Sequence, residues 1–114
     1  MSGTLPPGRE PRVYRVDKFI VPDGARGEFL DRVRQTHEIL RVQPGFLQDL
    51  VLEQPAGAGR FHLVTMVAWE GAAAIERAKA VVAERQKAAG FSPQELLARL
   101  GIQAELGSYR DAGL

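Results

Sequence analysis

Residues 60–70 carry apolar side chains on both faces of an extended strand, and this pattern limits the folds open to the chain. Side chains alternate between the two faces of a strand. One face of this segment holds Leu63 and Val67, and the other holds Val64 and Met66. An antiparallel strand with one face in water should alternate apolar and polar residues instead. The pattern therefore predicts a strand that is covered on both faces.

The length of the chain limits what can cover that strand. A chain of 114 residues is enough for one domain with a modest core. A layer of helices can cover one face of the sheet, but few residues then remain for the other face. A second copy of the chain is the simplest cover, so we expect a homodimer.

The remaining segments alternate between strand and helix patterns. Extended patterns predict strands over 13–21, 46–53, 60–70 and 102–109. Apolar residues at helical spacing predict helices over 25–42 and 72–89. A capping signature predicts a short third helix that begins at Ser92, Pro93 and Glu95. The order is that of the ferredoxin-like split βαβ fold, an α+β fold with a four-stranded antiparallel sheet and helices on one face.

Two regions precede or join these elements without a regular pattern of their own. Residues 1–11 contain three prolines and no apolar repeat, so we expect a flexible tail before a single domain over 12–114. Residues 54–59 are short and rich in glycine, which predicts the connection of a β-hairpin.

Charge and composition exclude several classes of protein. Fifteen basic and fourteen acidic residues leave a net charge of +1, whereas binding to nucleic acid or an anionic membrane needs a dense basic face. There is no cysteine, so the chain has no disulfide and no thiolate nucleophile. We find no signal-peptide pattern and no apolar run long enough to span a membrane, and therefore expect a cytoplasmic protein.

Several short motifs occur along the chain in a set order, namely Phe19–Gly24, Phe29, Gln43–Phe46 and Val67–Glu70. Together they resemble the motifs of the antibiotic biosynthesis monooxygenase family, which belongs to the dimeric α/β-barrel superfamily. The similarity covers about residues 12–89. It implies a dimeric α/β barrel in which two sheets face each other, with a pocket between each sheet and its own helices.

The resemblance also implies an activity. Characterised members of the family include small enzymes that oxidise polycyclic aromatic phenols or quinols with dioxygen, without a metal or flavin. We therefore expect a cofactor-independent monooxygenase that acts on a small aromatic phenol or quinol, with no cofactor and no metal site. Two alternatives remain open on the same scaffold. They are an isomerase or cyclase, and a non-catalytic dimer that binds a small ligand.

The family's site pattern matches this chain only in part. The branch that acts on aromatic polyketides has an Asn, a Trp and an Arg on the following helix. Trp69 matches the Trp, Thr65 falls near the Asn position, and Arg85 or Arg77 could stand for the Arg. The chain contains no Asn, which weakens the case for the quinol oxidation that is usual in this branch. Haem cleavage is disfavoured too, since that branch needs an Asn and has a His where Lys79 falls.

The two histidines occupy different positions in the pattern. His37 lies on the apolar stripe of the first long helix with Phe29 and Val33, so we expect it to face the pocket. A neutral imidazole there could accept a phenolic proton. A hydrogen bond to a backbone carbonyl or water is the structural alternative. His62 lies on the opposite strand face from Trp69, and would face the partner subunit if the Trp69 face meets the helices.

These considerations define the candidate site. The candidate catalytic residues are Trp69, His37 and Arg85. The candidate substrate-binding residues are Tyr14, Phe29, Val33 and Thr65. Trp69 would form a flat pocket wall or anchor the core, and an arginine would hold the developing anion. The spacing of the histidines supplies no third ligand, so no metal site is predicted.

Overall fold

The structure is a computed structural model that describes residues 11–114, so residues 1–10 of the predicted tail lie outside the described part. The strands are β1 (Val13–Pro22), β2 (Phe46–Gly57), β3 (Arg60–Trp69) and β4 (Gln103–Tyr109). The helices are α1 (Arg26–Leu40), α2 (Ala72–Ala88) and α3 (Pro93–Leu100), with a 3-10 turn η1 (Asp23–Ala25) before α1. Within the described residues, none of the helices combines the length and apolar character that crossing a bilayer would need.

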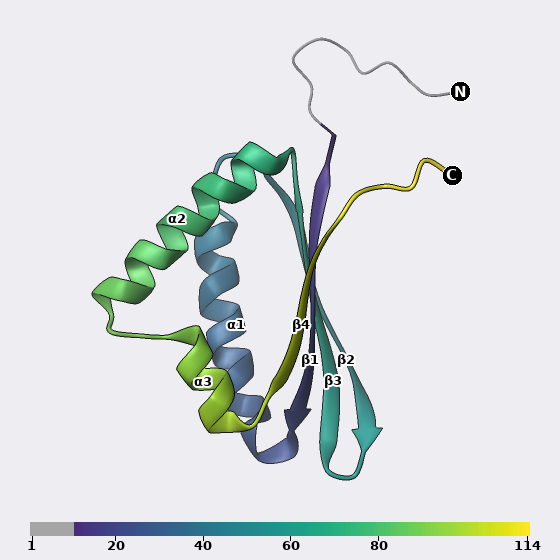
Figure 1. The fold of residues 1–114 in the computed structure, drawn as a ribbon, viewed down its shortest axis with the longest axis vertical. Coiled ribbons are helices and arrows are strands. Elements are labelled where there is room, and N and C mark those ends of the chain that lie inside the picture. The colour runs from purple at the N-terminus through teal and green to yellow at the C-terminus, as the bar shows by residue number, and fades with distance from the viewer. Residues whose placement is uncertain (1–10) are drawn as a thin grey trace.

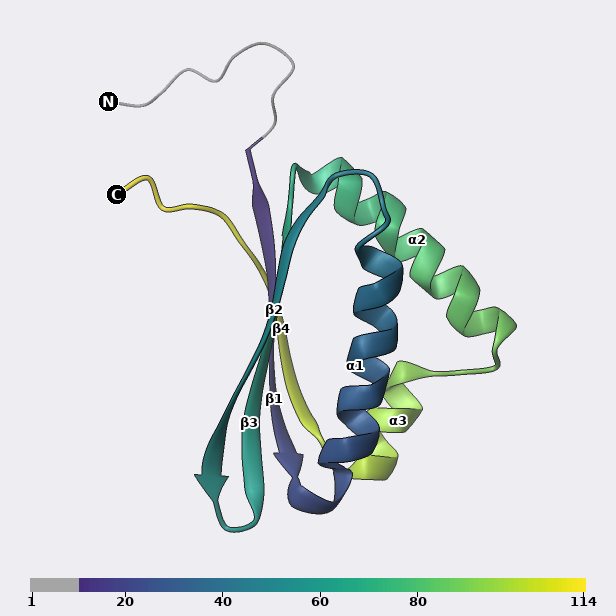
Figure 2. The same cartoon turned by 180° about the vertical axis from the view of Figure 1, so that it is seen from behind.

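The strands form one antiparallel sheet in the order β2-β3-β1-β4. All of the helices lie against one face of this sheet, and the opposite face carries none (Figures 1 and 2). This arrangement confirms the predicted ferredoxin-like α+β fold with a split βαβ order.

The register between β1 and β3 decides which side chains face the helices. Asp17 pairs with Thr65 and Val21 with Phe61, so the odd-numbered residues of both strands share the helical side. Trp69 lies on this side, is only 2% exposed, and packs edge-to-face against Phe46. The Trp69 face of β3 is therefore the one covered by helices.

Two separate apolar clusters join the helices to the sheet. The first contains Val21, Ala25, Phe29, Leu63, Leu96 and Ile102. The second contains Val67, Trp69, Ala74, Ile75 and Ala78. The first cluster holds α1 and α3, and the second holds α2. Two clusters in place of one continuous core leave room between them.

The hairpin between β2 and β3 is tighter than the sequence predicted. The strand β2 continues to Gly57, whereas we had expected it to end at Glu53. Three consecutive residues, Gly57 to Gly59, have positive φ and make the turn compact. Pro55 is tolerated inside β2 because β2 is an edge strand, where the missing N–H breaks no ladder.

Gly45 fixes the close approach between the start of β2 and α2. Its φ is +89°, and a Cβ atom there would overlap the Cβ of Ala74. Its carbonyl also accepts a hydrogen bond of 2.9 Å from the Glu70 N–H. This position therefore needs a residue without a side chain.

We predict that Gly45→Ala lowers the free energy of unfolding by about 1–3 kcal/mol, because it adds both backbone strain and a clash with Ala74. Gly24→Ala is the matched control, since a Cβ atom at Gly24 meets nothing within 4 Å. Urea denaturation followed by circular dichroism measures both. Equal stability of the two variants would contradict this account of Gly45.

Candidate functional site

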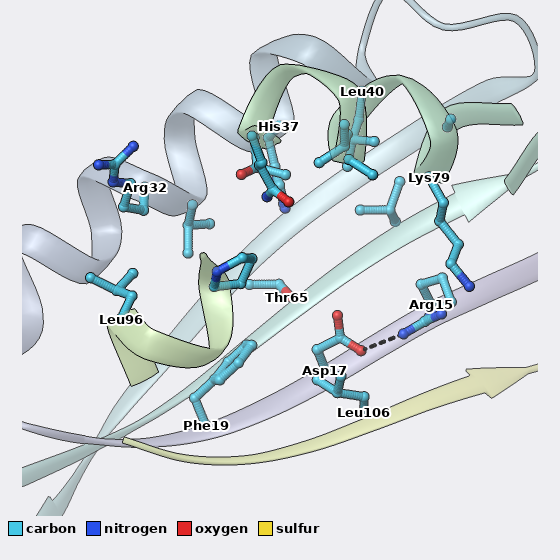
Figure 3. A pocket seen from close by; sticks show the side chains of 18 of the residues that line it. Arg15, Asp17, Phe19, Arg32, His37, Leu40, Thr65, Lys79, Leu96 and Leu106 are labelled. Atoms are coloured by element: carbon cyan, nitrogen blue, oxygen red, sulfur yellow. Dashed lines mark hydrogen bonds and ion pairs between the residues drawn. The ribbon is translucent and has the colours of Figure 1, made fainter. Parts of the chain in front are cut away.

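A cavity of about 420 Å³ lies between the helical layer and the sheet, in the space between the two apolar clusters (Figure 3). Its walls are mostly apolar and come from β1, β3 and all three α-helices. Leu106 of β4 also borders it and is 61% exposed, so the cavity opens beside this edge strand. The polar or charged side chains in its wall are Arg15, Asp17, Arg32, Thr36, His37, Thr65, Lys79 and Gln86.

Five of the candidate site residues line this cavity. They are Phe29, Val33, His37, Thr65 and Trp69. The first three come from one face of α1, where the helical spacing predicted them to be together. The other two come from the helical side of β3. The cavity therefore brings the predicted helix stripe and the predicted strand face together.

Tyr14 and Arg85, the other two candidate site residues, do not line this cavity. Tyr14 is an even-numbered residue of β1, so the strand pleat directs it to the face without helices, where it is paired with Tyr109 of β4. The α2 side chains in the wall lie at helical spacing, at Ile75, Ala78, Lys79, Val82, Ala83 and Gln86. Arg85 falls beside this stripe and is exposed, so Lys79 is the α2 cation at the cavity.

His37 is 5% exposed and lies beside an acidic residue that the sequence analysis did not single out. Its Nδ1 is 3.1 Å from Asp49 Oδ2, and the same oxygen accepts a 2.8 Å hydrogen bond from Arg41 Nε. The ring and carboxylate are at ion-pair distance, although no partner among residues 11–114 meets the angular requirement of a hydrogen bond to Nδ1.

A β-bulge turns Asp49 toward His37. Phe46 is opposite Trp69 and Gln48 is opposite Ala68, so Leu47 is an additional residue in β2. Without it, the alternation of the strand would place Asp49 on the face that lacks helices. No sequence pattern marked this bulge, which explains why the sequence analysis missed Asp49.

The surroundings of His37 lower its pKa below the usual value. Burial is the largest cause, because it disfavours the charged ring. The Asp49 carboxylate acts in the opposite direction, and the Arg41 guanidinium adds to the lowering. His37 is therefore neutral at pH 7. With the Asp49 carboxylate facing Nδ1, the ring proton is best placed on that atom, and Nε2 keeps its lone pair.

Two further features complete the cavity wall. Arg32 stacks on the ring of Phe91, with its guanidinium carbon 4.0 Å from the ring centroid. Arg15 Nη2 lies 3.4 Å from Asp17 Oδ1 on the same strand (Figure 3). Within residues 11–114, no group of three or more potential ligands from His, Cys, Asp and Glu is gathered to hold a metal ion.

The fold and the cavity define a ferredoxin-like protein with a largely apolar cavity between its sheet and its helices. Residues 12–90 match the family described as antibiotic biosynthesis monooxygenase. The chain belongs to this family, as the sequence motifs had indicated.

Solved structures with low sequence identity share the fold. SnoaB, a cofactor-independent oxygenase from Streptomyces nogalater, is 21% identical with a TM-score of 0.63, over 91% of this chain and 96% of that one. A putative monooxygenase from Shewanella loihica is 19% identical with a TM-score of 0.66, over 91% and 97%. A dimeric ferredoxin-like protein from an uncultured marine organism is 16% identical with a TM-score of 0.64, over 90% and 97%. No curated protein matches the chain.

The neutral state of His37 predicts a pH dependence of stability. Because its pKa is lowered on folding, the unfolded chain takes up this proton more readily than the native protein. The stability that comes from burying a neutral His37 is fully present above the unfolded pKa of about 6.5. It is lost as the pH falls below that value. We expect the free energy of unfolding to be lower at pH 5.5 than at pH 7.5.

Urea denaturation at the two pH values, with His37→Gln and His62→Gln as a matched pair, measures this effect. His37→Gln should reduce the difference between pH 5.5 and pH 7.5, whereas His62→Gln, at an exposed residue, should keep it. If the difference is unchanged in His37→Gln, burial of a neutral His37 is not its source.

Proposed function

We propose that the protein is a cofactor-independent monooxygenase that oxidises a small aromatic phenol or quinol with dioxygen. The observation that carries this proposal is His37, a buried and neutral imidazole in the cavity wall with the Asp49 carboxylate beside Nδ1. The membership of the family and the name of SnoaB as a cofactor-independent oxygenase support the class of reaction.

His37 would act as the general base. Its Nε2 accepts the proton of the substrate hydroxyl, and the Asp49 carboxylate then stabilises the imidazolium that forms. The resulting phenolate is far easier to oxidise than the phenol. The protein thereby activates the substrate itself, and dioxygen reacts with the bound anion.

The atoms balance for a phenol that carries a hydrogen at the para position. One electron passes from the phenolate to dioxygen, and the superoxide and the substrate radical combine at the para carbon. The hydroperoxide then loses that carbon's proton as its O–O bond breaks. One oxygen atom remains in the quinone product, and the other leaves as water with the proton taken from the hydroxyl and the one taken from carbon.

The cavity has the size and walls that this substrate class needs. Its volume of about 420 Å³ is in the range of small-molecule sites. Trp69 and Phe29 offer aromatic surfaces, and Val33 and Val67 line it with apolar side chains. The open volume also favours a ligand-binding site over a non-catalytic dimer whose pocket is filled by its own side chains.

Dioxygen consumption with a panel of naphthols and naphthoquinols tests the proposal. We expect His37→Ala to lower kcat/KM by roughly a hundredfold or more, which is the usual contribution of a general base. Trp69→Phe should mainly raise KM, because the ring is expected to bind substrate. His62→Ala is the matched control and should keep full activity. Equal background consumption by all of these proteins would refute the proposal.

The pH profile and a further variant refine the test. Activity should fall as the pH drops through the lowered pKa of His37, because the protonated ring cannot accept a proton. Asp49→Asn removes a group that raises this pKa, so the falling limb should move to lower pH while kcat decreases. Product formation under strict anaerobiosis would favour an isomerase or cyclase instead.

We further propose that the face of the sheet without helices is covered by a second copy of the chain. Leu50 and Leu52 of β2 are 41% and 53% exposed on this face, next to Met66 and Val64 of β3. The marine ferredoxin-like protein with this fold is described as dimeric, which supports the proposal.

Sedimentation at micromolar concentration should give the mass of two chains. Leu52→Glu should produce a monomer, because it places a charge in the proposed interface. Val42→Glu is the control, since Val42 is 75% exposed and lies outside the sheet. A wild-type monomer under these conditions would contradict the dimer.

A further inference from the structure

Two cationic side chains in the cavity wall have no part in the proposed proton transfer. They are Arg15 of β1 and Lys79 of α2, which come from opposite sides of the cavity. In Figure 3 the Lys79 side chain extends from its helix toward the head group of Arg15. Leu106, the exposed residue that marks the open side, lines the same cavity as both of them.

The guanidinium of Arg15 is poorly satisfied by the protein. Its Nε is buried and has no hydrogen-bond partner among residues 11–114. The side-chain hydrogen bond that it does make in that range, from Nη2 to Asp17 Oδ1, is long at 3.4 Å. A guanidinium carries five N–H donors, and a buried donor without an acceptor is costly. The side chain as a whole is still 24% exposed and lines the cavity, so its remaining guanidinium donors can meet an acceptor that enters there.

Lys79 contributes a second charge that is only loosely held. Its Nζ is 3.6 Å from Glu76 Oε2 on the same helix, and both side chains are mostly exposed. An exposed pair at this distance contributes little, so the ammonium is free to turn toward the cavity. An ammonium on a flexible stem opposite a planar guanidinium is suited to hold the two oxygens of one anion.

The balance of charge in the wall also favours an anion. Among the described lining residues, the cations are Arg15, Arg32 and Lys79, and the carboxylate is Asp17. His37 is neutral at pH 7. Arg32 is engaged with the Phe91 ring, so it does not compete for the same ligand group. This positive excess favours an anionic group in the ligand over a neutral one.

We propose that Arg15 and Lys79 form a carboxylate subsite, and that the ligand is a hydroxyaryl carboxylate whose hydroxyl lies at His37 while its carboxylate lies between the two cations. The inference rests on the proposed function for the aromatic and hydroxyl parts of the ligand. The planar guanidinium binds a carboxylate through two parallel N–H donors, which orients the ring as well as attracting it. This subsite selects the substrate and leaves the chemistry to His37.

Calorimetric titration with two probes tests the subsite in the absence of turnover. The probes are 6-hydroxy-2-naphthoate and 2-naphthol, which share the ring and hydroxyl and differ in the carboxylate. We expect the wild-type protein to bind the carboxylate roughly tenfold or more tightly, since hydrogen bonds to a charged group have this effect on affinity. The preference should shrink at high salt.

Variants assign the preference to the two cations. Lys79→Gln and Arg15→Gln should each remove most of the preference while leaving the affinity for 2-naphthol unchanged. Lys87→Gln is the matched control, because Lys87 is an exposed cation of the same helix that does not line the cavity. Since Lys79 is exposed, its variant is expected to fold even if Arg15→Gln does not, and circular dichroism checks both.

The outcomes separate this inference from the proposed function. Equal binding of both probes, binding of neither, or a preference that survives Lys79→Gln overturns the carboxylate subsite. Oxidation of uncharged quinols alone would leave the monooxygenase proposal intact without the subsite. A retained preference for the carboxylate in a protein that consumes no dioxygen would support the subsite and refute the monooxygenase.

Discussion

The burial of one face of β3 beneath the helices is the constraint on which the rest of the structure depends. It directs Thr65, Val67 and Trp69 inward and leaves Val64 and Met66 on the other face. Because β1 pairs with β3 in a fixed antiparallel register, Arg15 and Asp17 must point inward as well. The same pairing that forms the core thus also brings charged residues to the cavity.

The cavity follows from how the helices are attached. The first apolar cluster fastens α1 and α3 to one part of the sheet, and the second fastens α2 near Trp69. Figure 1 shows α2 moving away from the sheet along its length before the chain returns to α3. The side chains of the two layers therefore do not fill the middle, and a mostly apolar cavity remains there.

His37 shows how burial and charge combine at this site. Burial lowers the pKa of the ring and so favours its neutral form. The Asp49 carboxylate, which lies beside Nδ1, raises the pKa and partly offsets the effect of burial. Asp49 also accepts a hydrogen bond from Arg41, and the Arg41 guanidinium adds to the lowering of the His37 pKa. The three residues hold an imidazole that is neutral at rest and that can be stabilised as a cation once it has accepted a proton.

Much of the fold could be predicted from local patterns, because strand and helix periods depend on near neighbours in the chain. The apolar stripe of α1 placed Phe29, Val33 and His37 together, and the alternation of β3 placed Thr65 and Trp69 on one face. The helix and strand periods alone did not place every candidate residue at the cavity. Arg85 is one position away from the cavity stripe of α2, and Tyr14 is on the strand face that points away from the helices.

The sequence by itself determined the order of the elements, the antiparallel sheet, the apolar faces and the presence of a histidine on the inner stripe of α1. Only the tertiary structure decided which charged groups meet inside. A single bulge at Leu47 turns Asp49 toward His37, and the pairing of β1 with β3 sets Arg15 in the cavity wall that Lys79 reaches from α2. The physical reason is that these contacts join residues far apart in the chain, so they depend on register and helix placement, which no local pattern encodes.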